Sequence, residues 1–125
     1  MNNEKSQTDN SGQFKAGVIP LIDGYINTDS ESGKLFGFTS DLFDGYLWKR
    51  DKDIYVSFII SKKQGKGNLR RLFDNILKAG YNIKVPTPLP RMEMILRKFG
   101  FKHTFESEEY YCDGESVDVW LKQAV

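Results

Sequence analysis

Residues 61–69 read Ser61-Lys62-Lys63-Gln64-Gly65-Lys66-Gly67-Asn68-Leu69. An apolar, strand-like run from Ile54 to Ile60 precedes this stretch, and a helical pattern from Leu69 to Ala79 follows it. A glycine loop between a strand and a helix presents backbone N–H groups to an anion, and the helix N-terminus adds roughly half a positive charge. The sequence therefore predicts an anion-binding loop at this junction.

The composition limits the classes of protein that this chain can belong to. With 125 residues it has room for one ordinary domain and one hydrophobic core. A single cysteine and a single histidine argue against a disulfide framework, a multi-cysteine zinc site and a histidine-based metal site. A net charge of +1 gives no overall field for nucleic acid or membrane.

The ends of the chain differ in character from the rest. Residues 1–13 are polar after the first methionine, which predicts a disordered N-terminal tail before a single domain spanning residues 14–125. We find no signal-peptide pattern and no apolar run near the length of a membrane span. These patterns favour a cytoplasmic protein with no membrane partner.

The first half of the domain is weakly patterned. Residues 14–26 predict one or two short strands or irregular packing, and residues 27–33 predict a loop. Leu35–Thr39 is apolar and predicts a short strand. Gly45–Lys49 and Ile54–Ile60 predict a hairpin around the polar turn at residues 50–53.

The second half is more regular. Five residues of the predicted helix share one apolar face: Leu69, Leu72, Phe73, Ile76 and Leu77. Gly80 is placed to end this helix. Tyr81–Val85 predicts a strand parallel to Ile54–Ile60, and Pro90 predicts the first turn of a second helix ending at Gly100.

Strands are expected to complete the C-terminal part. They are predicted at residues 101–106, 109–112 and 117–121, with a hairpin turn at Asp113-Gly114. The expected fold is α/β (α+β), a mixed twisted sheet with helices packed on it.

This order of elements resembles the GNAT superfamily, the GCN5-related N-acetyltransferases. Gln64-Gly65-Lys66-Gly67-Asn68-Leu69 occupies the place of the family's pyrophosphate loop, Q/R-x-x-G-x-G/A, and Gly100-Phe101 matches the pair that opens its final strands. The resemblance covers residues 46–122, and it extends to small GNAT-like proteins of phage genomes. It implies that acetyl-coenzyme A is the co-substrate and that an unidentified amine is the acceptor.

The resemblance also implies which residues contact the cofactor. The pantetheine arm would lie between two diverging parallel strands, and the pyrophosphate would meet the loop. By position these residues are Phe58, Ile59, Ile60, Ser61, Gln64, Gly65, Lys66, Gly67, Asn68 and Leu69. Five cations lie nearby: Lys62, Lys63, Lys66, Arg70 and Arg71. They suit a ligand with several phosphates, although a solvated helix start is the simpler interpretation.

The chain departs from the family at two positions that matter for catalysis. Leu69 stands where the family prefers a small residue, and Leu96 stands where many members have a tyrosine that protonates the departing thiolate. Candidates for a replacement acid are Tyr110, Tyr111 and Glu93. Aromatic packing in a sheet is the simpler interpretation of the two tyrosines, and a solvated helix carboxylate is the simpler interpretation of Glu93.

Three functions therefore stay open. The first is acyl-coenzyme A-dependent N-acyltransfer to an amine. The second is a catalytically silent GNAT-like scaffold acting as a binding or virion protein, which Leu69 and Leu96 favour. The third is a nucleic-acid module using the basic loop, which the near-neutral net charge argues against. Thr87 and Arg91, in the proline-rich segment, can also face a ligand, although a stiff connector into the second helix is the simpler interpretation of this segment.

Overall fold

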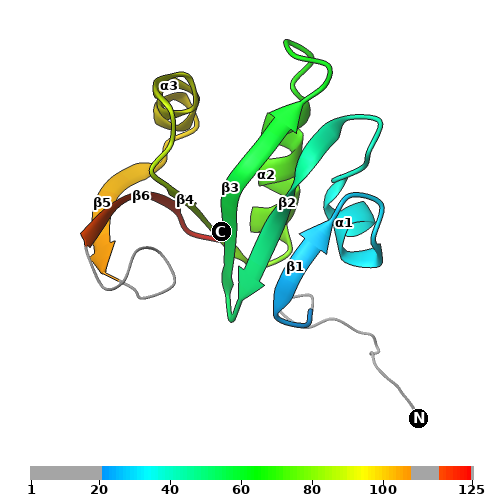
Figure 1. Ribbon diagram of the computed structural model, residues 1–125, viewed down its shortest axis with the longest axis horizontal. Helices are drawn as coiled ribbons and strands as arrows, with labels where there is room; N and C mark the ends of the chain where they lie inside the picture. The colour runs from blue at the N-terminus through cyan, green and yellow to red at the C-terminus, as the bar shows by residue number, and fades with distance from the viewer. Residues whose placement is uncertain (1–20, 108–115, 125) are drawn as a thin grey trace.

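The computed structural model describes residues 21–107 and 116–124. Six strands form one mixed sheet in the order β1-β2-β3-β4-β6-β5, and three short helices, α1 to α3, accompany it (Figure 1). The expected α+β class, a mixed sheet with helices packed on it, is confirmed.

Antiparallel pairs make up most of the sheet. β1 (Gly24–Asn27), β2 (Phe43–Arg50) and β3 (Asp53–Ser61) form a meander. β4 (Asn82–Pro86) runs parallel to β3, and β6 (Ser116–Lys122) lies antiparallel between β4 and β5 (Lys102–Ser107). The predicted hairpin and the parallel strand pair joined by a helix are both confirmed.

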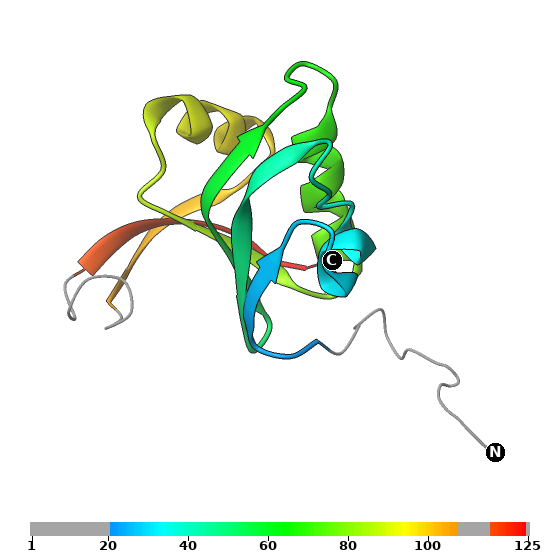
Figure 2. The same ribbon diagram turned by 45° about the vertical axis from the view of Figure 1, so that its right-hand side comes forward.

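The helices pack on one face of the sheet. α2 (Asn68–Lys78) buries Leu72, Phe73 and Ile76 in the core cluster, as its periodicity predicts. α3 (Pro90–Lys98) begins with Pro90 in its first turn and buries Leu96. Figure 2 shows α2 and α1 behind the first three strands. Among the described residues, no helix covers the opposite face of these strands, which we call the open face.

The predicted strand at Leu35–Thr39 is wrong, and so is part of the predicted loop at residues 27–33. The chain instead forms α1 (Glu31–Phe36). Ser30 caps this helix by accepting a hydrogen bond from the Gly33 N–H, and Gly37 ends it in the left-handed region at φ 79°. A helix of six residues is too short to show a helical period, so Leu35, Phe36 and Phe38 resemble a strand in sequence.

Several predictions from the sequence lie outside the described residues. These are the tail at 1–13, the pattern at 14–20, the strand at 109–112 and the turn at Asp113-Gly114. Within residues 21–107 and 116–124, no helix is long and apolar enough to cross a membrane.

A β-bulge in β3 shapes the centre of the sheet. Tyr46 lies opposite Phe58 and Trp48 lies opposite Tyr55, so two residues, Val56 and Ser57, face Leu47 alone. A bulge bends its strand and increases the local twist. β3 and β4 pair only from Asp53 to Tyr55, and the rest of β3 diverges from β4. The bulge therefore begins where the parallel pairing ends.

Candidate ligand groove

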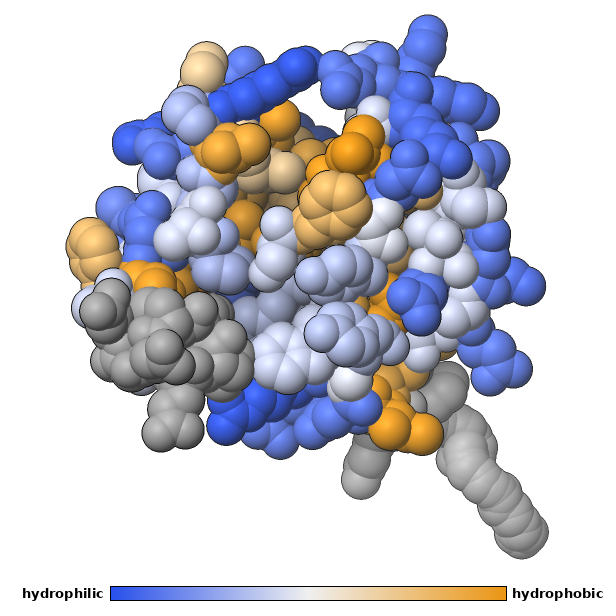
Figure 3. Space-filling model, viewed as in Figure 1, coloured by the Kyte–Doolittle hydropathy of each residue, from blue (hydrophilic) through white to orange (hydrophobic). Residues whose placement is uncertain are grey.

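A groove of about 610 Å³ lies where β3 leaves β4. The outer half of β3, the loop at residues 61–67 and the start of α2 form one side, and residues 86–89 and α3 form the other. Figure 3 shows the hollow from the open face, with apolar residues in and around it and hydrophilic residues along its upper rim. The groove thus combines an apolar interior with a polar border.

Two local features keep the groove open. Pro86 ends β4 and has no backbone N–H to offer a neighbouring strand. The bulge turns β3 away at the same level, since Tyr55 pairs with Lys84 two residues before Pro86. Beyond Tyr55, β3 has no described strand partner on its β4 side, so its backbone groups there are accessible to an extended ligand.

The loop before α2 adopts the conformation that its glycines predict. Gly65 and Gly67 have φ of 80° and 77°, in the left-handed region that disfavours other residues. Gly67 is the N-cap of α2, and no side chain caps the helix or places a carboxylate in its first turn. The first N–H groups of α2 therefore lack a side-chain acceptor, which leaves them available to an anion.

Arg71, which does not line the groove, holds this loop in place. Its guanidinium donates to the Lys66 carbonyl at 3.0 Å and also to the Asn68 side-chain oxygen. Asn68 is buried, with 8% of its surface exposed. Lys66, whose carbonyl accepts from Arg71, does not line the groove. The loop is thus fixed by side-chain contacts without using the N–H groups at the helix end.

The charge in the groove is of one sign. Four cationic side chains line it, Lys63, Arg70, Arg91 and Lys98, and no carboxylate of the described residues does. Arg70 also lies over the Phe99 ring, 5.4 Å from its centroid. In a chain of net charge +1, this concentration of cations creates a local field that favours a ligand with several negative charges.

A hydrogen bond crosses the groove at its outer end. The Arg91 guanidinium, on α3, donates to the Gln64 side-chain oxygen, on the loop, at 2.6 Å. Both residues line the groove. Since one comes from each side, the pair joins the two walls above the ligand space.

Thr87 contributes backbone strain to the groove wall. Its φ of 41° lies in the left-handed region, where a β-branched residue is an outlier. The Thr87 N–H donates to the Asp118 carbonyl at 2.7 Å, which ties this residue to β6. The surrounding structure therefore holds Thr87 in a conformation that threonine disfavours.

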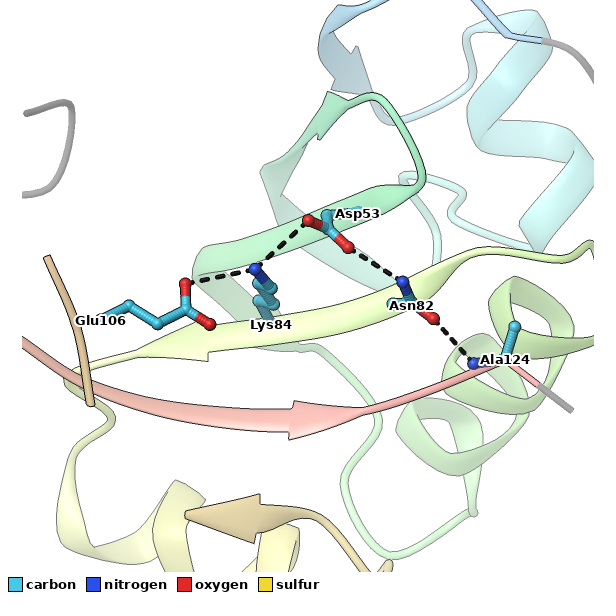
Figure 4. A network of polar contacts seen from close by, with 5 residues as sticks. All are labelled: Asp53, Asn82, Lys84, Glu106 and Ala124. Carbon is cyan, nitrogen blue, oxygen red and sulfur yellow. Dashed lines mark hydrogen bonds and ion pairs between the residues drawn. The ribbon is translucent and has the colours of Figure 1, made fainter. Parts of the chain in front are cut away.

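A polar network fixes the closed end of the diverging strands (Figure 4). The Lys84 ammonium lies 3.2 Å from carboxylate oxygens of both Asp53 and Glu106. Asn82 donates to Asp53 at 3.0 Å and accepts from the Ala124 N–H at 2.9 Å. Burial alone would lower the pKa of Lys84, but the bond to Glu106 and the charge of Asp53 raise it above its ordinary value.

The residues expected to contact the cofactor are largely brought together. Lys66 is the one of the ten that does not line the groove. The nine that do are Phe58, Ile59, Ile60, Ser61, Gln64, Gly65, Gly67, Asn68 and Leu69. Leu69 also packs against the core cluster. The loop and the diverging strand thus form one continuous surface.

Of the three candidate acids, only Glu93 belongs to the described residues, and it is not part of the groove. Glu93 lies outside its lining and pairs with Arg97 at 3.5 Å on the same helix. Tyr110 and Tyr111 lie outside the described residues. Leu96 is fully buried and does not line the groove.

The groove also contains residues that the sequence pattern did not assign to a site. Met92, Ile95, Lys98 and Phe99 line its second wall. The spacing of Met92, Ile95 and Phe99 predicts only the packed face of a helix. Their helix lies beside β3 only because β4 diverges there, and no local signal in the sequence records that. Searches with the chain against models of protein families, curated proteins and solved structures found no match.

Proposed function

We propose that the chain is an acyl-coenzyme A-dependent N-acyltransferase of the GNAT type, which transfers acetyl from acetyl-coenzyme A to an amine. The observation that carries this proposal is the groove between diverging parallel strands, ending on an uncapped helix N-terminus. The resemblance in sequence leads to the same ligand, because it calls for a diverging strand pair followed by a pyrophosphate loop.

The residues of the groove suit the parts of this ligand. The free edge of β3 at residues 56–61 offers backbone donors and acceptors to the amide groups of a pantetheine arm. The N–H groups at Gly67 and Asn68 suit the pyrophosphate. Lys63, Arg70, Arg91 and Lys98 supply counter-charge for the phosphates.

The chemistry required is a direct transfer. The amine nitrogen attacks the thioester carbonyl, a C–N bond forms, the C–S bond breaks, and the thiolate leaves. The nitrogen loses a proton and the thiolate gains one, which water can carry between them. Backbone N–H groups on the free edge of β3 are available to donate to the oxyanion.

A specific observation favours a second candidate, the silent binding scaffold. Among the described residues, no Asp, Glu, His, Cys or Tyr lines the groove. The position where many GNAT proteins have a tyrosine is Leu96, which is buried in the core. Such a groove can hold the cofactor without a side chain that moves protons.

Calorimetry with acetyl-coenzyme A tests the shared claim of cofactor binding. We expect a saturable heat in the wild type that weakens in Gly67→Ala. Gly37→Ala is the matched control, because Gly37 has φ 79° against 77° for Gly67, and a Cβ at either lies 3.4 Å from a side-chain nitrogen. Absence of heat in the wild type, or equal weakening in both variants, would remove the cofactor claim.

Thiol release separates the two candidates. The enzyme should release coenzyme A faster when amines, lysine peptides or aminonucleosides are added to acetyl-coenzyme A. If the cofactor binds and no acceptor accelerates release, the chain acts as the silent scaffold.

A further inference from the structure

A row of aromatic rings crosses the open face of the sheet. Tyr25 on β1 lies edge-on to Tyr46 on β2, with ring centroids 5.2 Å apart. Tyr46 in turn lies 6.2 Å from Phe58 on β3. Tyr25 and Phe58 have 70% and 50% of their surface exposed, so the row presents its rings to solvent rather than to the core.

The row leads into the groove. Phe58 is both its last ring and a lining residue of the groove, one position after the bulge. Ile60, two residues further on, is also exposed and lines the groove. Figure 3 shows the open face as one surface on which the hollow is accessible. A molecule lying on the row therefore reaches the groove beside the bulge of β3.

A carboxylate lies beside this path. The groove contains four cations and, among the described residues, no carboxylate. On the open face, Asp44 precedes Tyr46 by two residues on β2 and lies opposite Ile60. Its side chain is 60% exposed, and its ion pair with Lys62 is loose, at 3.5 Å. Carboxylates and aromatic ring faces both attract cations.

We infer that the row Tyr25–Tyr46–Phe58, together with Asp44, is the binding surface for the acyl acceptor, and that the acceptor is an aliphatic primary amine. The amine binds as its ammonium ion and gives one proton to water before its nitrogen attacks the thioester. This inference rests on the proposed function, since the groove must hold the acyl donor. The acyl donor then lies against the cations of the groove, whereas the acceptor lies against ring faces and the Asp44 carboxylate, and the two substrates meet at Phe58. A nucleotide would also stack its base on aromatic rings, but its phosphates require cations, and the three residues of the row carry none.

A titration followed by ¹⁵N NMR tests the acceptor surface without acetyl-coenzyme A. The probe is butylammonium, and n-butanol is its uncharged counterpart. We expect butylammonium to shift the amide signals of Tyr25, Tyr46 and Phe58 saturably, and butanol to shift them at least threefold less at equal concentration. Equal effects of the two probes, or butylammonium shifts centred elsewhere, would overturn the inference.

Three variants sharpen this test. Tyr46→Leu keeps apolar bulk and removes the ring face, and Asp44→Asn removes the charge; each should weaken butylammonium binding at least threefold. Phe105→Leu is the control, because Phe105 is an exposed aromatic residue on β5, outside the row. Unchanged α2 signals, from the face of the sheet opposite the row, report that each variant is folded. If sedimentation shows a dimer that Tyr46→Leu dissociates, the surface binds a second copy and the inference fails.

Calorimetry with acetyl-coenzyme A on the same samples distinguishes the two possible failures. Acetyl-coenzyme A binding without butylammonium shifts would overturn only the acceptor surface. If butylammonium shifts the signals but acetyl-coenzyme A does not bind, the proposed function fails, and the row then has no role as an acceptor surface.

Discussion

Gly45 and Phe58 approach so closely across β2 and β3 that a Cβ on Gly45 would lie 2.2 Å from the Phe58 carbonyl oxygen. Gly45 also has φ 114°, which L-residues with a side chain rarely adopt. This contact is next to the bulge at Val56 and Ser57, from which β3 diverges. The bulge from which β3 diverges, and with it the groove on the far edge of β3, therefore depends on glycine at position 45.

Gly45→Ala should destabilise the protein and disturb the bulge. The added methyl group must displace backbone, so we expect a loss of about 3 kcal/mol in the free energy of unfolding, measured with urea. Gly24→Ala is the matched control, because Gly24 has φ 127° but nothing within 4 Å of its Cβ position. Equal losses in the two variants would show that backbone strain alone matters.

Arg91→Gln should weaken acetyl-coenzyme A binding. The change removes one of the four groove cations and the donor to Gln64, and a hydrogen bond to a charged group contributes about 1.5 kcal/mol or more, so Kd should rise roughly tenfold. Arg97→Gln, on the same helix but outside the groove, is the control for calorimetry. A change in Kd that is the same for both variants would mean that helix charge acts at long range.

Thr87→Asn should stabilise the protein. Asparagine tolerates the left-handed region far better than threonine, so relief of the strain at φ 41° should raise the free energy of unfolding by about 1 kcal/mol. Thermal and urea unfolding measure the change. If stability falls instead, the threonine side chain makes a contribution that outweighs the strain.

Lys84→Met should lower stability at neutral pH and flatten its dependence on alkaline pH. The pKa of Lys84 is raised above the unfolded value of 10.5, so its stabilising contribution is present below pH 10.5 and is lost as pH rises through the folded pKa. Loss of the shared cation leaves Asp53 and Glu106 close together, at a cost of roughly 2 kcal/mol.

Urea unfolding between pH 7 and pH 11 measures this prediction. The control is Lys102→Met, which removes an exposed lysine from β5. If the loss of stability at alkaline pH persists unchanged in Lys84→Met, groups other than Lys84 cause that loss.

Strong local patterns account for the parts of the fold that the sequence predicts well. α2 has five apolar residues on one face, and α3 begins at a proline, so both were predictable from local chemistry. α1 was not, although Ser30 and Gly37 are good caps, because six residues carry too little periodicity. A cap pair enclosing Glu31–Phe36 was the available signal.

The candidate site divides in the same way. The loop at residues 64–67 has its own signature, whereas Lys98 and Phe99 join the groove only through tertiary structure. The bulge depends on two strands meeting at Gly45 and Phe58, and neither strand shows it alone. The sequence therefore indicates where an anion binds, but not the second wall that encloses the ligand.

The free edge of β3 has a consequence for the solubility of the protein. An unpaired strand edge is a template on which another chain can add and begin to aggregate. Here the edge at residues 56–61 lies inside a groove whose far wall contains Pro86 and Pro88, and the Arg91–Gln64 bond crosses its outer end. The walls that hold a single extended ligand thus also shield the edge from the strands of a neighbouring molecule.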